Sequence, residues 1–101
     1  MNNEQEEHIK IKLAITLYKL LSLNKKQKNM DSIAKSYNQI ALSADIRKAT
    51  VSNIFNARSV PNFRTLILII EAMEYTLGDF AKVYESIEFS EISQFKNKDV
   101  E

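Results

Sequence analysis

The 101-residue chain contains a single glycine, Gly78, and a single proline, Pro61. Sheet proteins use glycine in their hairpin turns, and doubly wound α/β folds use glycine-rich loops between strand and helix. A chain with so few of these residues has little material for either kind of connection. The scarcity predicts an all-α fold, and a chain of this length is expected to form one domain with its own core.

Apolar residues recur every three or four positions along most of the chain, which is the spacing of a helix with one buried face. Five such segments are separated by polar or capping residues. The predicted helices cover residues 9–23, 32–44, 48–56, 63–73 and 77–88. Residues 1–8 are acidic and polar, so they are expected to form a flexible N-terminus that precedes a folded domain over residues 9–88.

The start of the second helix has two candidates. Asp31 can cap a helix that begins near Ser32. Alternatively, Ser36 and Gln39 have the spacing of a capping box, in which each side chain bonds the backbone N–H of the other residue. We favour the start near Ser32, because the apolar spacing already begins there.

Capping residues also mark the last two predicted helices. Asn62 is expected to cap the fourth helix, and Thr76 together with Asp79 is expected to cap the fifth. The inward-facing residues of the fifth helix are predicted to be Leu77, Phe80, Ala81, Tyr84 and Ile87. Residues 89–101 have weak periodicity, so they form either a short docking helix or a frayed tail. This tail is also a candidate dimer element, through Phe89, Ile92 and Phe95.

Charge is segregated along the chain, although the net charge is only +1. Residues 1–9 hold three glutamates, and residues 10–64 hold eleven Lys or Arg against two Asp. Residues 65–101 hold three Lys against eight acids. One small body with a basic surface and an acidic surface is expected, and the basic surface suits a nucleic acid. Ordinary solvated helix charges are the competing interpretation.

The residues needed for several other functions are missing from the sequence. There is no cysteine and His8 is the only histidine, so neither a disulfide nor a zinc cluster can be built. With His8 as the only histidine and Gly78 as the only glycine, the sequence also offers neither a nucleophile paired with a histidine base nor a glycine-rich phosphate loop. We therefore expect no enzyme, no metal and no cofactor. The start of the chain is not a secretory signal and no run is long enough to span a bilayer, so a cytoplasmic protein without membrane contact is expected.

Residues 48–56 carry the clearest two-faced pattern. Val51, Ile54 and Phe55 lie at i, i+3 and i+4, so they share one face of a short helix. The opposite face and the helix start carry Arg47, Lys48, Ala49, Ser52, Asn53 and Asn56. The turn "SADIR" over residues 43–47 joins this helix to the one before it. Two short helices joined in this way are the geometry of a helix-turn-helix, whose second helix enters the major groove of DNA.

Residues 40–80 carry a known set of features in one continuous register. They are the pair Ile40 and Ala41, Ile46 in the turn, "TVSNI" over 50–54, Pro61, the pair Thr65 and Leu66, and "LGDF" over 77–80. This register resembles the Cro/C1-type helix-turn-helix domain, and the likeness extends over about residues 10–88. The resemblance implies a lambda-repressor-like fold of five helices. It also implies a transcriptional regulator, a repressor in our interpretation, that binds a palindromic site on double-stranded DNA as a homodimer.

Three positions differ from the pattern of this family. Asp45 stands at the glycine of the turn, and Ala57 stands where a glycine usually ends the recognition helix. Aspartate tolerates the left-handed backbone conformation better than most residues. After the recognition helix, we expect either Asn56 to take the left-handed conformation or the loop to follow a different path. Phe55 replaces a common glutamate and is expected to pack inward.

The resemblance also assigns roles to individual residues. Lys48, Ala49 and Asn53 fall where family members contact base edges. The flanking positions are held by Arg47, Thr50 and Ser52. Asparagine can pair with adenine through two hydrogen bonds, lysine can donate to guanine, and alanine can touch the methyl group of thymine. Phosphate contacts are expected from Ser36, Tyr37, Arg58, Ser59 and Asn62.

Two other functions stay open at this point. The acidic C-terminal half could bind a protein partner, as an antitoxin or an adaptor does, and such a protein can also act as a repressor. A non-specific nucleic-acid binder would use the basic surface without reading sequence, and Asn53→Ala would then leave base discrimination unchanged. Lys25, Lys26 and Lys28 either add attraction for DNA or belong to a solvated link.

Overall fold

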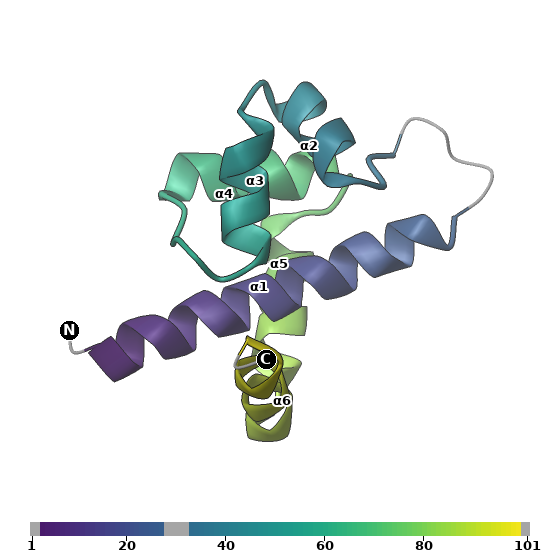
Figure 1. Cartoon of the computed structure of the whole chain (residues 1–101). Coiled ribbons are helices and arrows are strands. Elements are labelled where there is room, and N and C mark those ends of the chain that lie inside the picture. The colour runs from purple at the N-terminus through teal and green to yellow at the C-terminus, as the bar shows by residue number, and fades with distance from the viewer. Residues whose placement is uncertain (1–2, 28–32, 100–101) are drawn as a thin grey trace.

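A computed structural model describes residues 3–27 and 33–99 of the chain, and helices are its only regular elements in these ranges (Figure 1). They are α1 (Asn3–Lys25), α2 (Tyr37–Ala44), α3 (Lys48–Phe55), α4 (Phe63–Ala72), α5 (Leu77–Ser86) and α6 (Phe89–Asp99). The prediction of an all-α fold is confirmed. The described part has six helices rather than the five expected, because residues 89–99 form the docking helix that weak periodicity had left open.

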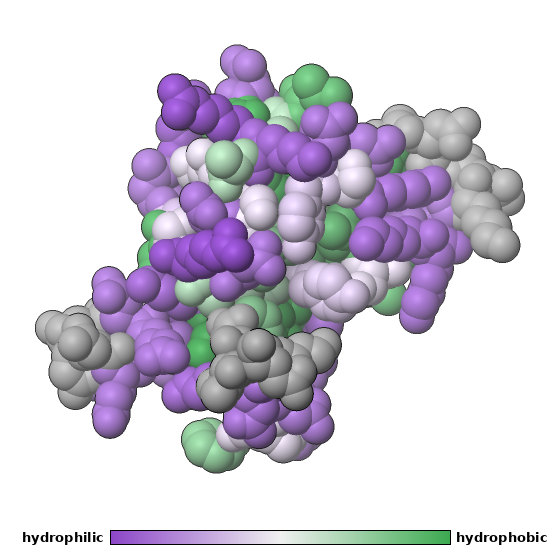
Figure 2. Space-filling view, viewed as in Figure 1, coloured by the Kyte–Doolittle hydropathy of each residue, from purple (hydrophilic) through white to green (hydrophobic). Residues whose placement is uncertain are grey.

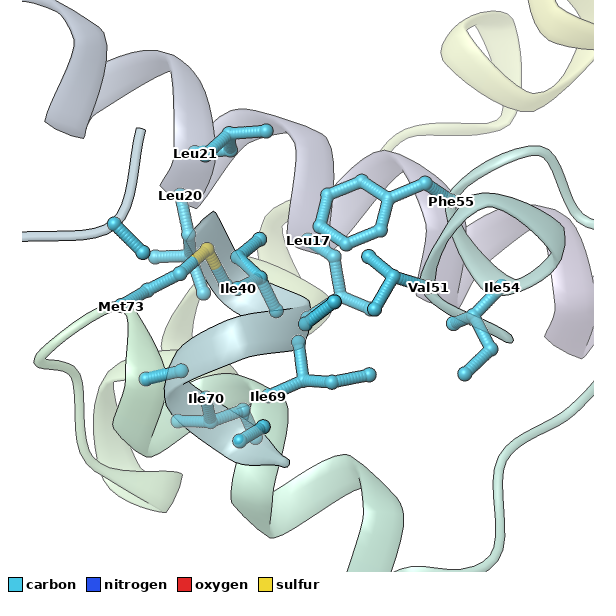
Figure 3. Close-up of a cluster of buried hydrophobic side chains, with 14 of the residues drawn as sticks. Leu17, Leu20, Leu21, Ile40, Val51, Ile54, Phe55, Ile69, Ile70 and Met73 are labelled. Carbon is cyan, nitrogen blue, oxygen red and sulfur yellow. The ribbon is translucent and has the colours of Figure 1, made fainter. Parts of the chain in front are cut away.

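Helix α1 crosses the molecule, with α2, α3 and α4 on one side and α6 on the other (Figure 1). The molecule measures 39 × 29 × 24 Å, and Figure 2 shows a mostly hydrophilic face over α2 and α3. The main core fills the space between α1 and the three helices on its upper side. Figure 3 shows its central side chains, among which Leu17, Ile40, Val51 and Ile69 have no exposed surface.

A second and smaller cluster lies on another face of α1. Its buried members are Ile11, Ile87 and Ile92, and Phe95 packs against them. Ile92 and Phe95 are three positions apart on α6, so both can reach α1 from one face of that helix. This contact turns residues 89–99 into a docked helix.

The first helix begins earlier than its apolar pattern predicts. Residues 3–8, which were expected to belong to a flexible N-terminus, form the first turns of α1. Two acidic residues, Glu4 and Glu6, lie in the first turn, where negative charge favours the helix dipole. Glu6 also lies 4.0 Å from Lys10, one turn further on. Local electrostatics therefore extend the helix beyond its buried stripe.

The prediction that the second helix starts near Ser32 is wrong. Helix α2 begins at Tyr37, because Ser36 is its N-cap and its hydroxyl oxygen accepts the N–H of Gln39 at 3.1 Å. The Gln39 side chain accepts the N–H of Lys35 at 2.6 Å instead of closing the capping box on Ser36. Asp31 and Ser32 lie outside the described residues. The start of α2 is therefore set by the Ser36 cap and not by the apolar spacing, which begins several residues earlier.

The other two predicted caps are confirmed. Asn62 accepts the N–H of Thr65 at 2.8 Å, and Thr76 and Asp79 form a complete capping box. Leu77 and Ala81 were expected to face inward and are exposed instead. The inward stripe of α5 runs through Phe80, Val83 and Tyr84 and continues to the C-cap residue Ile87, and Leu77 and Ala81 lie beside it. Helix α5 ends at Ser86, two residues before the predicted end.

Asn24 holds three separate segments together at the C-terminal end of α1. Its side chain is buried, and its Nδ2 donates to the carbonyl oxygens of Ala34 at 3.0 Å and Met73 at 2.9 Å. Ala34 precedes α2 and Met73 follows α4. One side-chain amide therefore provides hydrogen bonds to two backbone carbonyl groups from different segments of the chain.

Candidate nucleic-acid interface

The turn between α2 and α3 sets the position of the recognition helix. Asp45 adopts a left-handed conformation with φ 57° and ψ 49°, as expected for its place at the family's turn glycine. The N–H groups of Asp45 and Ile46 both donate to the carbonyl oxygen of Ala41. Ile46 then packs against the main core. These contacts end α2 and direct the chain into α3.

Helix α3 separates a buried face from a polar face, as its sequence predicts. Val51, Ile54 and Phe55 are between 0% and 3% exposed, and all three lie in the core of Figure 3. The inward packing of Phe55 is confirmed. On the other side, Arg47, Lys48 and Ala49 are exposed, whereas Thr50, Ser52 and Asn53 are half-buried. This outward face lies in the largely hydrophilic area of Figure 2.

The polar groups of α3 differ in whether the fold already uses them. The Asn56 Nδ2 donates to the Ser52 carbonyl at 2.8 Å and to its hydroxyl oxygen at 3.3 Å. The side-chain amide of Asn53 makes no hydrogen bond within the described part of the chain. Arg47 is the N-cap of α3 and contributes no side-chain cap, so the first N–H groups of the helix have no side-chain acceptor. Asn53 and the helix start can therefore bond an external molecule.

The loop after α3 takes its left-handed residue one position later than we expected. Ala57 has φ 59°, whereas Asn56 has φ −100°, so the first of the two alternatives, a left-handed Asn56, is wrong. The N–H of Ala57 donates to Ile54 at 3.2 Å and that of Arg58 donates to Asn53 at 2.8 Å. These two backbone bonds hold Ala57 in the conformation that a glycine would adopt more easily.

A shallow depression of about 270 Å³ brings together three of the predicted DNA-contacting residues. Ser36, Tyr37 and Lys48 line it, together with Leu21, Lys25 and Asn38. The Ser36 oxygen accepts a cap bond, but its hydroxyl proton can still be donated. Burial, with Tyr18 nearby, raises the pKa of the Tyr37 hydroxyl above its ordinary value of 10.0, so it also stays a donor at neutral pH. The depression thus presents hydroxyl and ammonium donors to one point.

The remaining predicted phosphate contacts lie apart from this depression. Arg58 and Asn62 are exposed and Ser59 is half-buried, and all three belong to the loop between α3 and α4. None of them lines the depression. Asn62 uses its side-chain oxygen as a cap, which leaves its amide N–H groups available.

Sequence reasoning did not assign contacts to Asn38 or Arg64, and it gave Lys25 two equal explanations. Asn38 and Lys25 become candidates because they share the depression with Lys48. Arg64 is exposed in the first turn of α4. A cation in the first turn of a helix is unfavourable for the helix dipole. The positions of Lys48 and Arg64 therefore do not serve helix stability, and this is the sequence feature that could have pointed to a role in binding. Lys28 lies outside the described residues.

Other kinds of site find little support in the described ranges. No group of three His, Cys, Asp or Glu within residues 3–27 and 33–99 could hold a metal ion. None of the helices in these ranges combines the length and the apolar character needed to cross a membrane.

Two short helices joined by a tight turn, the second with a polar outward face, define the helix-turn-helix class. A family model described as helix-turn-helix matches residues 27–80, which is more than half of the chain. The chain therefore belongs to the Cro/C1-type helix-turn-helix family of DNA-binding regulators. No curated protein and no solved structure gives a significant match.

Proposed function

We propose that the chain is a sequence-specific transcriptional repressor that places α3 in the major groove of DNA. The observation that carries the proposal is the polar face of α3, where the Asn53 amide has no partner within the described residues and Lys48 and Ala49 are exposed. Asn53 would pair with adenine, Lys48 would donate to guanine, and Ala49 would contact a thymine methyl group. The flanking contacts would come from Arg47, Thr50 and Ser52.

Backbone contacts would fix the position of α3 in the groove. Ser36 and Tyr37 in the depression would donate to one phosphate, with Lys25 close by. A second set of phosphate contacts would come from Arg58, Ser59 and Asn62. Arg64, at the start of α4, adds positive charge next to this set. With several phosphates contacted, affinity would fall steeply as salt rises.

The proposal is tested by selecting bound duplexes from a random DNA pool at near-physiological salt. We expect an enriched sequence motif. Asn53→Ala should then lose discrimination at one base pair by about 1–3 kcal/mol, whereas Arg58→Ala should weaken binding to all sequences and lower the salt slope by about one. Gln94→Ala, an exposed change on α6, is the matched control. A folded protein that enriches no motif would contradict the proposal.

We further propose that the protein binds a palindromic operator as a homodimer. The three apolar tail residues expected at the interface have different environments. Ile92 is buried and Phe95 is half-buried in the second cluster, whereas Phe89 is 78% exposed. Phe89 is therefore the residue of this set that is free to meet a second copy. Phe89→Ser should lower the mass measured by light scattering from dimer to monomer, and an unchanged dimer would place the interface elsewhere.

A protein partner is the second candidate function. Four glutamates, Glu71, Glu74, Glu85 and Glu88, are exposed and make no ion pair within the described residues. These free carboxylates suit a basic partner, as in an antitoxin or an adaptor. Capture of a basic protein that is lost in Glu85→Lys, together with a selection that enriches no DNA motif, would favour this function.

A further inference from the structure

An open groove of about 730 Å³ runs along α1. It shares Tyr37 with the depression, but none of the proposed base-contacting residues of α3 lines it. We call it the α1 groove. Its lining includes Ile15 and Leu23 from α1, Val83 from α5 and Phe95 from α6. Leu23 is 48% exposed and Tyr18, which also lines the groove, is 55% exposed. Two large side chains of α1, Tyr18 and Leu23, are therefore exposed to solvent in the same groove.

The charge of the α1 groove has one sign. Lys19 and Lys26 line it, and no acidic residue does. Lys19 already pairs with Glu91. Lys26 is exposed and makes no ion pair within the described part of the chain. The groove thus offers one available ammonium group at the edge of an apolar surface.

Aromatic rings supply much of the remaining lining. Tyr18, Tyr37, Phe55 and Phe95 all line the groove. Its volume falls in the range of about 300–1,000 Å³ that is typical of small-molecule sites, which are apolar with a few polar groups for orientation. Ser22 and Ser86 provide hydroxyl groups. These features together fit a small molecule with a flat apolar body and one anionic group.

We propose that the α1 groove binds an aromatic carboxylate, with its ring system against the apolar lining and its carboxylate at Lys26. The groove also touches both helices of the helix-turn-helix. Tyr37 opens α2, Phe55 closes α3, and their rings lie 4.7 Å apart between centroids. Asn56, also in the lining, bonds Ser52 on α3. Resting on the proposed function, we infer that an occupant shifts these two helices, which weakens DNA binding.

The binding part is tested on the isotope-labelled full chain, without DNA, by titration with 1-naphthylacetate. We expect the amide resonances of the groove residues to shift, and the neutral isostere 1-naphthylacetamide to bind several-fold more weakly. Leu23→Glu and Lys26→Gln should each weaken binding about five-fold or more, since one adds a repelling carboxylate and the other removes the counter-charge. Lys25→Gln removes the same charge one position along α1, outside the groove, and should change affinity less than about two-fold.

Several results would overturn the site. No shift of groove resonances at millimolar ligand would do so, as would equal affinity for the carboxylate and the amide. Loss of a dimer in Leu23→Glu, measured by light scattering, would show instead that a second copy of the chain occupies the groove.

The regulatory part is tested with the duplex selected above. Saturating 1-naphthylacetate should weaken DNA binding by wild type and leave Lys26→Gln less affected. Unchanged DNA affinity at saturation would overturn the coupling. Failure of the proposed function would look different, because no duplex would then be bound specifically even without ligand.

Discussion

The main core and the second cluster use different faces of the same helix. Among the described residues, the main core buries sixteen between α1 and α2 to α5, whereas the second cluster buries three, Ile11, Ile87 and Ile92. The first holds the helix-turn-helix, and the second holds α6. Because stabilisation grows with the apolar area buried, the two regions should differ in how readily they open.

This difference has a functional meaning. A recognition helix must present its side chains in fixed positions, so α3 benefits from being packed on the larger core. The main helix partner of α6 is α1, and α6 lies outside the matched residues 27–80. We therefore expect α6 to open without disturbing the DNA-contacting face.

The largest effect is expected for Ile70→Ala in the main core. Ile70 is 1% exposed and lies among the central side chains of Figure 3. Truncating the Ile70 side chain to a single methyl group leaves a cavity in the core, so the free energy of unfolding should fall by about 2–5 kcal/mol. Urea denaturation followed by circular dichroism measures the change. A loss below that of Ile92→Ala would reverse the ranking of the two regions.

The next effect is expected for Asn24→Leu, which keeps the size of the side chain and removes its donors. The carbonyl groups of Ala34 and Met73 would lose their bonds to Nδ2, and an unsatisfied buried group costs about 1–3 kcal/mol. We expect a loss of this size in the same urea experiment. Asn97→Leu changes an exposed asparagine on α6 and should have little effect. Equal stability of the two variants would remove the role of Asn24.

Local chemistry made much of the main region predictable. The caps Asn62 and Thr76 bond groups three residues away, so a short stretch of sequence contains both partners. The left-handed turn at Asp45 and the two faces of α3 are equally local. Asn24 was missed because its acceptors lie 10 and 49 residues further along the chain. Only the packed fold brings such groups together.

The candidate site was predictable to the same degree. Helical geometry alone separates Lys48, Ala49 and Asn53 from the buried side of α3. The depression depends on the approach of α1, α2 and α3, so its inclusion of Lys25 and Asn38 had no local signal. Helix α6 was left undecided because its polar residues weaken the apolar period, and its contact with α1 supplies the rest of its stability.

A smaller effect is expected for Ile92→Ala. Ile92 is 3% exposed, but its cluster lies at the edge of the molecule and can collapse around the lost atoms more easily than the main core. We expect the loss in global stability to be less than half of that for Ile70→Ala. Amide hydrogen exchange should show protection lost over residues 89–99 and retained in α2 to α4. Simultaneous loss in both regions would show that they form one cooperative unit.

The smallest effect is the pH dependence of α6. A hydrogen bond from Lys19, together with the N–H of Glu88, lowers the pKa of Glu91 below its ordinary value of 4.5. The unfolded chain therefore takes up this proton at a higher pH than the folded chain does. The stabilisation is complete above pH 4.5 and is lost as the pH falls toward the lowered pKa. Protection of α6 from hydrogen exchange should fall in this acidic window, while α3 keeps its protection.

Glu91→Gln should remove most of this pH dependence of α6. The control is Glu85→Gln, which changes an exposed glutamate of α5 that makes no ion pair within the described residues, and it should leave the pH dependence intact. If α6 in Glu91→Gln still loses protection over the same range, the ion pair with Lys19 is not what makes this region sensitive to acid.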